Sequence, residues 1–134
     1  MIYITRRETF SAAHRLFRPE LSDEENAKIF GKCSNPNWHG HNYTLEVTVA
    51  GEVDEHTGFV LDLKLLKEII RENVIEHVDH KNLNTDTIFM KGLIPTSENI
   101  CIAIWKQLED KIPNGKLYSI KLYETENNYF EYRG

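Results

Sequence analysis

The chain has 134 residues, of which 40% are hydrophobic, and its formal net charge is −5. This length favours one domain over residues 1–134, and the acidic balance argues against general binding to nucleic acid. No apolar run approaches the roughly 20 residues of a membrane span, and the first residues lead directly into charged ones, so we expect neither a membrane segment nor a signal peptide. Cys33 and Cys101 make no disulfide framework, which predicts a cytoplasmic protein.

The first half of the chain predicts two strands around a long loop. Residues 2–14 are rich in β-branched and aromatic types and should be extended. Residues 17–37 carry proline, serine, asparagine and charges, which indicates a loop with a short helix at Asp23–Phe30; a loop this long is usually functional. Residues 41–50 give the clearest strand signal, because four apolar residues alternate with polar ones. They are Tyr43, Leu45, Val47 and Val49.

The second half begins with two predicted helices. Gly51–Gly58 suits a turn and residues 58–61 a short extended run, after which Asp62 suits a helix N-cap. Apolar residues then recur at the three- and four-residue spacing of a helix face. They are Leu65, Leu66, Ile69, Ile70, Val74 and Val78. After a second loop, residues 79–95, Thr96 or Ser97 can cap another helix. Its inward residues should be Ile100, Ala103, Ile104 and Leu108.

Two further strands complete the predicted fold. Pro113–Gly115 ends the second helix, and alternation then predicts a strand with Tyr118, Ile120 and Leu122 on one face. Asn127-Asn128 suits a turn, and Tyr129–Tyr132 a last strand. The order β-β-α-α-β-β predicts an α+β fold with an antiparallel sheet and helices on one face.

Histidine spacing is the strongest chemical signal. His39 and His41 stand two residues apart where a strand begins, so their side chains share a face about 6.6 Å apart along the strand. His14, at the end of the first extended segment, is a candidate third ligand. Three imidazoles leave one position of a tetrahedral zinc ion open to substrate, which is typical of a catalytic site. His56 and His77 have the pattern of surface histidines.

Cys33 lies six residues before His39 and admits three interpretations. It is a fourth zinc ligand that closes a structural site, an inert small side chain, or a nucleophile or base with a stabilised thiolate. Cys101 lies on the inward side of a helix and should be packed in the core.

Two acidic residues also suggest chemistry. Asp79 precedes His80 in a loop, and an aspartate that orients an imidazole can serve a thiol; the alternative is a charge pair at a helix end. Glu124 continues the apolar side of a strand, where a carboxylate is costly unless it is paired. It would bind adjacent N–H donors of a polar heterocycle, unless the strand has already left the sheet there.

Basic residues near these positions could attract an anionic substrate despite the net charge. The candidates are Lys32, Arg15, Arg18 and Lys81. The alternative for each is a solvated surface charge.

Taken together, five segments resemble the 6-pyruvoyl-tetrahydropterin synthase family. They are Phe10–Leu16, Gly31–Tyr43, Val78–Asn84, Pro95–Asn99 and Leu122–Asn128. The resemblance implies the tunnelling fold, with a four-stranded antiparallel sheet and two helices on one side. It also implies a homohexamer, built as a dimer of trimers, with sites between subunits.

The family's roles fall on residues of this chain. By resemblance, His14, His39 and His41 bind zinc and Cys33 abstracts a proton. Asp79 and His80 activate Cys33 across a subunit interface. Glu124 holds the pterin ring and takes part in the relay. Thr96, Ser97 and Lys32 are expected to contact the substrate. That substrate would be 7,8-dihydroneopterin triphosphate, converted to 6-pyruvoyl-tetrahydropterin with release of triphosphate.

Three other functions stay open at this level. The similar 6-carboxytetrahydropterin synthases of queuosine and deazapurine biosynthesis use the same substrate and release acetaldehyde as well. The five residues between Cys33 and His39 favour the pyruvoyl type, whereas Asp62 favours the carboxy type. The others are a non-catalytic zinc- or pterin-binding module and a structural zinc site closed by Cys33.

Overall fold

Two long strands form the centre of the sheet. In the computed structural model, which describes residues 1–134, β1 (Ile2–His14) and β2 (His39–Gly51) run antiparallel along their full length. Their register starts at Ile2 opposite Gly51 and ends at His14 opposite His39. The predicted extents of both strands are confirmed, with β2 starting two residues earlier.

The complete sheet has five strands in the order β3-β1-β2-β4-β5. β4 (Lys116–Thr125) pairs antiparallel to β2, and β5 (Asn128–Tyr132) pairs antiparallel to β4. β3 (Lys81–Asn82) pairs parallel to β1. The predicted α+β fold is confirmed, but the sheet has a fifth strand, and β3 makes it mixed where a purely antiparallel sheet of four strands was expected. A two-residue strand inside a loop is too short to show an alternating pattern.

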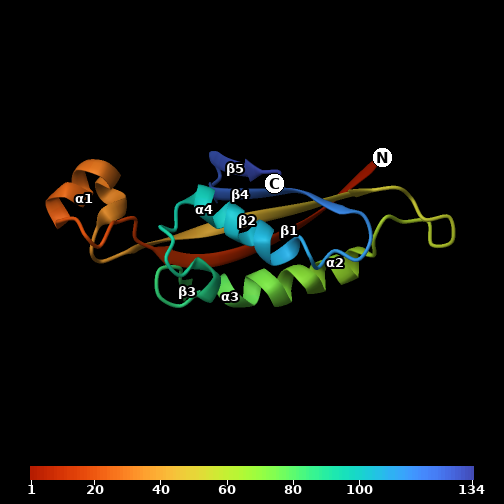
Figure 1. The fold of residues 1–134 in the computed structure, drawn as a ribbon, viewed down its shortest axis with the longest axis horizontal. Helices are drawn as coiled ribbons and strands as arrows, with labels where there is room; N and C mark the ends of the chain where they lie inside the picture. The colour runs from red at the N-terminus through yellow and green to blue at the C-terminus, as the bar shows by residue number, and fades with distance from the viewer.

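Helices cover one face of this sheet (Figure 1). α2 (Leu63–Ile70), the π-helical turn η2 (Arg71–Ile75) and α3 (Glu76–Val78) form one continuous segment, and α4 (Ser97–Leu108) lies beside it on the same face. Leu66, Ile70, Val74 and Val78, four residues apart, are fully buried. Leu65 was expected to be inward but is 39% exposed, because one helical step turns it about 100° away from that row.

The helix caps agree with the sequence. The carboxylate of Asp62 accepts a hydrogen bond from the backbone N–H of Lys64, and Thr96 accepts one from Asn99. Residues 58–61, by contrast, form no strand. Asp54 folds the preceding loop into a tight turn, with its N–H bonded to the carbonyl of Phe59, and Val60 and Leu61 are delivered to the core.

Between β1 and β2 the chain leaves the sheet and forms a small lobe. It contains α1 (Asp23–Phe30) and the 3-10 turn η1 (Gly31–Ser34), and it projects from one end of the sheet (Figure 1). A capping box between Ser22 and Glu25 starts α1 at the predicted residue. The remaining element is the 3-10 turn η3 (Ile88–Met90). No helix combines the length and the apolar character that crossing a membrane requires.

Candidate metal and substrate site

Strand register brings three histidines together. His14 and His39 are direct cross-strand partners on β1 and β2, and His41 follows two residues along β2 on the same face. Their ligand nitrogens all lie within 4.8 Å of one another, and the Nε2 atoms of His14 and His39 are 3.0 Å apart. The site can hold one metal ion. Neither Cys33 nor Glu124 belongs to this group of atoms.

Hydrogen bonding fixes the direction of His14. Its Nδ1 lies 2.8 Å from the carbonyl oxygen of Pro95. A carbonyl can only accept, so Nδ1 carries the hydrogen and the neutral ring presents the lone pair of Nε2 to the other two histidines. An outer partner of this kind orients most metal-bound histidines in proteins.

Burial favours the neutral form of two of these histidines. Burial lowers the pKa of His14 and of His39 below the ordinary histidine value, and the neighbouring imidazoles lower both further. Uncharged rings are the form that binds metal. Nε2 of His41 is buried without a hydrogen-bond partner, although Oε1 of Glu124 lies 3.4 Å away. An orphaned imidazole nitrogen beside two others is what a metal-free ligand set should show.

Glu124 reaches the histidines through a β-bulge. Tyr123 pairs with Tyr129 and Thr125 pairs with Asn128, so Glu124 is the extra residue on β4. A bulge redirects a side chain, and the Glu124 carboxylate is half-buried between His41 and α4. Oγ of Ser97, in the first turn of α4, donates a hydrogen bond to its Oε2. The structure thus joins Glu124 and Ser97, both of which the sequence suggests as substrate-contacting residues on separate grounds.

The other residues expected to act at this site are Thr96, Lys32 and Cys33. Thr96 uses its hydroxyl as the α4 cap, and Lys32 is exposed on η1. Cys33 is also on η1, partly buried and free, and the buried thiol of Cys101 donates to the carbonyl of Phe130. Burial raises the pKa of Cys101 to about 12, so this second thiol stays protonated and is inert.

Asp79 and His80 lie elsewhere in this chain. Oδ1 of Asp79 is 3.0 Å from Nδ1 of His80 and accepts a hydrogen bond from the backbone N–H of Ser11, also at 3.0 Å. That backbone bond and the imidazole lower the pKa of Asp79. Both residues, with Ser11 and Asn42, line a hollow of about 410 Å³, and side chains of Ser11 and Asn42 point away from the face that carries the histidines. No hydrogen bond or ion pair joins Asp79 or His80 to the three histidines.

Sequence reasoning missed two residues of this site. The sequence indicates only that Pro95 ends a loop, because residue types do not reveal which backbone carbonyl accepts a hydrogen bond from His14. Tyr43 was read as core, and it is fully buried, but its hydroxyl also lies 3.4 Å from Nδ1 of His14. Burial raises the pKa of the Tyr43 hydroxyl, so this group stays neutral where it borders the site.

Comparison with known proteins agrees with this geometry. The family model described as 6-pyruvoyl tetrahydropterin synthase matches residues 3–134. The chain is 50% identical to the 6-pyruvoyl tetrahydrobiopterin synthase of Pongo abelii, over 98% of this chain and 90% of the relative. The solved 6-pyruvoyl tetrahydropterin synthase of Caenorhabditis elegans superposes with a TM-score of 0.92 at 44% identity, covering 99% and 95% of the two chains.

Similarity to the carboxy type is weaker. The 6-carboxy-5,6,7,8-tetrahydropterin synthase of Rickettsia typhi is 32% identical over 98% of this chain and 99% of that protein. A family model over nearly the whole chain, relatives near half identity and a matching fold agree on one assignment. This chain is a member of the 6-pyruvoyl tetrahydropterin synthase family.

Proposed function

We propose that the protein is a zinc-dependent lyase that converts 7,8-dihydroneopterin triphosphate to 6-pyruvoyl-tetrahydropterin and releases triphosphate. The observation that carries the proposal is the meeting of three imidazoles, whose ligand nitrogens all lie within 4.8 Å of one another with no thiol among them. Such a set leaves a zinc ion open to substrate. Relatives near half identity that are named for this synthase support the choice of reaction.

We assign the metal to Nε2 of His14, whose direction is fixed by Pro95, and to the facing nitrogens of His39 and His41. The residues fit a zinc ion, because Nε2 of His41 has no other partner and burial keeps His14 uncharged. When bound, zinc would polarise the substrate's side-chain hydroxyls and stabilise negative charge that develops there. We assign zinc because three histidines with one open tetrahedral position are a ligand set of catalytic zinc sites.

We assign proton abstraction to Cys33. The reaction removes weakly acidic protons from carbon, and a thiolate is a suitable base when it is placed close to them. Cys33 is free and partly exposed, whereas Cys101 is buried and protonated. Of the two thiols, only Cys33 is accessible to a substrate.

Asp79 and His80 are proposed to activate Cys33 of a neighbouring subunit. Within one chain they pair with each other, and Asp79 also accepts a hydrogen bond from the backbone N–H of Ser11. A site shared between subunits would explain why Asp79 orients the imidazole of His80 although its own chain places no thiol beside it. We therefore propose a homohexamer of two trimers, with each site between subunits.

Substrate contacts are assigned around Glu124. Its carboxylate, held by Ser97, would accept hydrogen bonds from adjacent N–H groups of the pterin ring. Thr96 lies beside Ser97, and Lys32 would offer charge to the triphosphate. We also propose a cytoplasmic location, since both cysteines are free.

The proposal is tested by incubating zinc-loaded protein with 7,8-dihydroneopterin triphosphate and measuring triphosphate, acetaldehyde and product mass. We expect triphosphate and 6-pyruvoyl-tetrahydropterin without acetaldehyde. Acetaldehyde with 6-carboxytetrahydropterin would assign the protein to the carboxy type instead. Absence of triphosphate release would refute both activities.

A further inference from the structure

The backbone that carries Cys33 is anchored to the residues that follow His14. The backbone N–H of Leu16 donates to the carbonyl of Cys33 at 2.8 Å. Nε of Arg15 donates to the carbonyl of Ser34, also at 2.8 Å. Two consecutive carbonyls of η1 are therefore bonded to the two residues directly after a candidate metal ligand.

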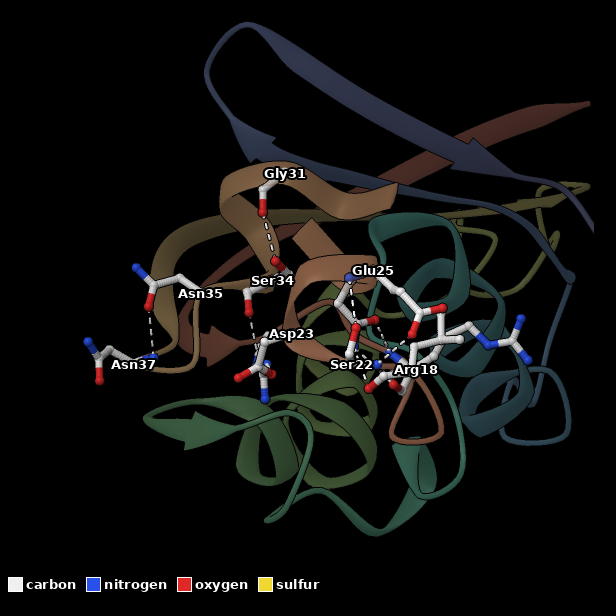
Figure 2. A network of polar contacts seen from close by, with 11 residues as sticks. Arg18, Ser22, Asp23, Glu25, Gly31, Ser34, Asn35 and Asn37 are labelled. Atoms are coloured by element: carbon white, nitrogen blue, oxygen red, sulfur yellow. Dashed lines mark hydrogen bonds and ion pairs between the residues drawn. The ribbon is translucent and has the colours of Figure 1, made fainter. Parts of the chain in front are cut away.

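Arg15 is itself held on several sides. The carbon of its guanidinium lies 4.0 Å from the ring centre of Phe17, and Nη2 lies 3.2 Å from a carboxylate oxygen of Asp23 in α1. Figure 2 shows Asp23 and Ser34 side by side, and Arg15 bonds to both. Only 12% of the Arg15 side chain is exposed, which is unusual for arginine.

The backbone of Arg15 is held in place as well, by the side chain of Asn84. Oδ1 of Asn84 accepts from the Arg15 N–H at 2.9 Å, and Nδ2 of Asn84 donates to the Arg15 carbonyl at 2.8 Å. This pair extends the contact of β3 with β1, in which Leu83 already donates to the carbonyl of Ala13. Arg15 thus has a rigid base from which its side chain can hold η1.

We propose that Arg15 is a positioning residue for Cys33, setting the place of η1 relative to the three histidines. The inference rests on the proposed role of Cys33 in proton abstraction. A planar guanidinium can stack on Phe17 and donate from its edge to Ser34 and Asp23 at once. A lysine at this position keeps the charge but can provide neither the stacked plane nor the Nε donor, so charge and geometry can be separated.

The test compares Arg15→Lys with the matched control Arg133→Lys. The Arg133 side chain is 59% exposed, pairs with Glu131 and lies over the ring of Tyr118, so this control makes the same change without touching η1. Four quantities are measured on zinc-loaded protein: bound zinc, kcat, KM and the alkylation rate of Cys33 by iodoacetamide. Cys101 is 2% exposed and should not react, so alkylation reports Cys33 alone.

For Arg15→Lys we expect kcat to fall about 10- to 100-fold, the cost of displacing a reacting group by about 1 Å. Alkylation of Cys33 should change several-fold, while bound zinc and KM stay within about twofold. Arg133→Lys should match the wild type in all four measurements. Unchanged kcat and alkylation in Arg15→Lys, or a loss confined to zinc content or folding, would overturn the inference.

Two further measurements keep the outcome interpretable. If Arg15→Lys does not fold, Asp23→Asn removes the charged partner of Nη2 at a position whose side chain is 81% exposed. Its kcat should fall about two- to fivefold, as for the loss of one exposed ion pair, and an unchanged kcat would count against Arg15. If wild-type protein or Cys33→Ala shows that the proposed function itself is wrong, the alkylation comparison still decides whether Arg15 places the thiol.

Discussion

Glu124 lies against His41, with 3.4 Å between Oε1 of the carboxylate and Nε2 of the imidazole. The two residues come from neighbouring strands, and the bulge on β4 is what turns the carboxylate toward β2. Oε2 of Glu124 is held by Ser97 at the start of α4. A single carboxylate therefore joins the candidate metal ligands to the candidate substrate contacts.

Glu124→Gln should lower kcat/KM about 10- to 100-fold, because the amide loses charge-assisted hydrogen bonds worth roughly 1.5–3 kcal/mol. Bound zinc should not change, since Glu124 is not one of the three ligands. Steady-state kinetics and metal analysis measure both effects. Glu126→Gln, an exposed site two residues away, is the control and should behave as the wild type. Loss of zinc from Glu124→Gln would mean that the carboxylate is a ligand.

Chelation should abolish activity but leave the protein folded, because one cluster of 22 buried hydrophobic residues forms the core, beside the buried His14. At a hundredfold excess over its dissociation constant, the metal should contribute only about 3 kcal/mol to stability. Circular dichroism and urea unfolding check this. His39→Ala should lose the metal in the same way, and His56→Ala, in an exposed turn, should keep it. Unfolding on chelation would support a structural zinc site.

The metal-free protein should lose stability in mild acid. Burial lowers the pKa of His14 in the folded state, so the unfolded chain binds the proton more tightly. This contribution to stability is complete above the ordinary histidine pKa of about 6.5 and is lost as pH falls from there toward the lowered value. Each histidine adds at most about 1.4 kcal/mol per pH unit. Urea unfolding at several pH values measures the slope, and His14→Gln should reduce it; equal slopes would contradict the assignment.

Co-expression of Cys33→Ala and His80→Ala subunits should restore activity that neither variant has alone. If each site takes its thiol from one chain and its imidazole from the next, random assembly leaves about one quarter of sites intact. Activity of the mixed, co-purified assembly measures this fraction. Cys33→Ala mixed with Cys33→Ser is the control and should stay inactive. No recovery in the mixed assembly would place both groups in one subunit.

Asp62→Asn should change neither stability nor product. Asp62 caps α2 through Lys64, and asparagine is about as good at an N-cap. We expect the free energy of unfolding to change by less than about 0.5 kcal/mol and acetaldehyde to remain absent from the products. Ser22→Ala, by contrast, should cost about 1 kcal/mol by removing the capping box of α1. A shift toward acetaldehyde in Asp62→Asn would show that this residue selects the product.

Local patterns were enough to predict most elements of this fold. Period-two alternation predicted β2, helical spacing predicted the buried row from Leu66 to Val78, and short polar side chains marked the caps at Asp62 and Thr96. These features depend on neighbours in sequence, so the sequence displays them. Strand parity likewise predicted that His39 and His41 share a face, whereas the place of His14 opposite His39 depends on the register between β1 and β2.

Features created by pairing between distant segments were not accessible. β3 exists only because His80 and Leu83 donate to carbonyls of β1, and two residues carry no period. The bulge at Glu124 depends on the register of β5, which alternation on β4 cannot reveal. The same limit applies to Asp79 and His80. Their residue types indicate acid–base chemistry, but local sequence patterns do not reveal where they lie relative to the sheet.

The acceptor for His14 is the main-chain carbonyl of Pro95. Substitution of a side chain cannot delete a carbonyl group, and only a shift of the α4 entry loop could withdraw it. Most point mutations near His14 should therefore leave the orientation of its ring unchanged. During evolution, the side chains around this site can change while the ring orientation of His14, the most buried of the three histidines, is inherited intact.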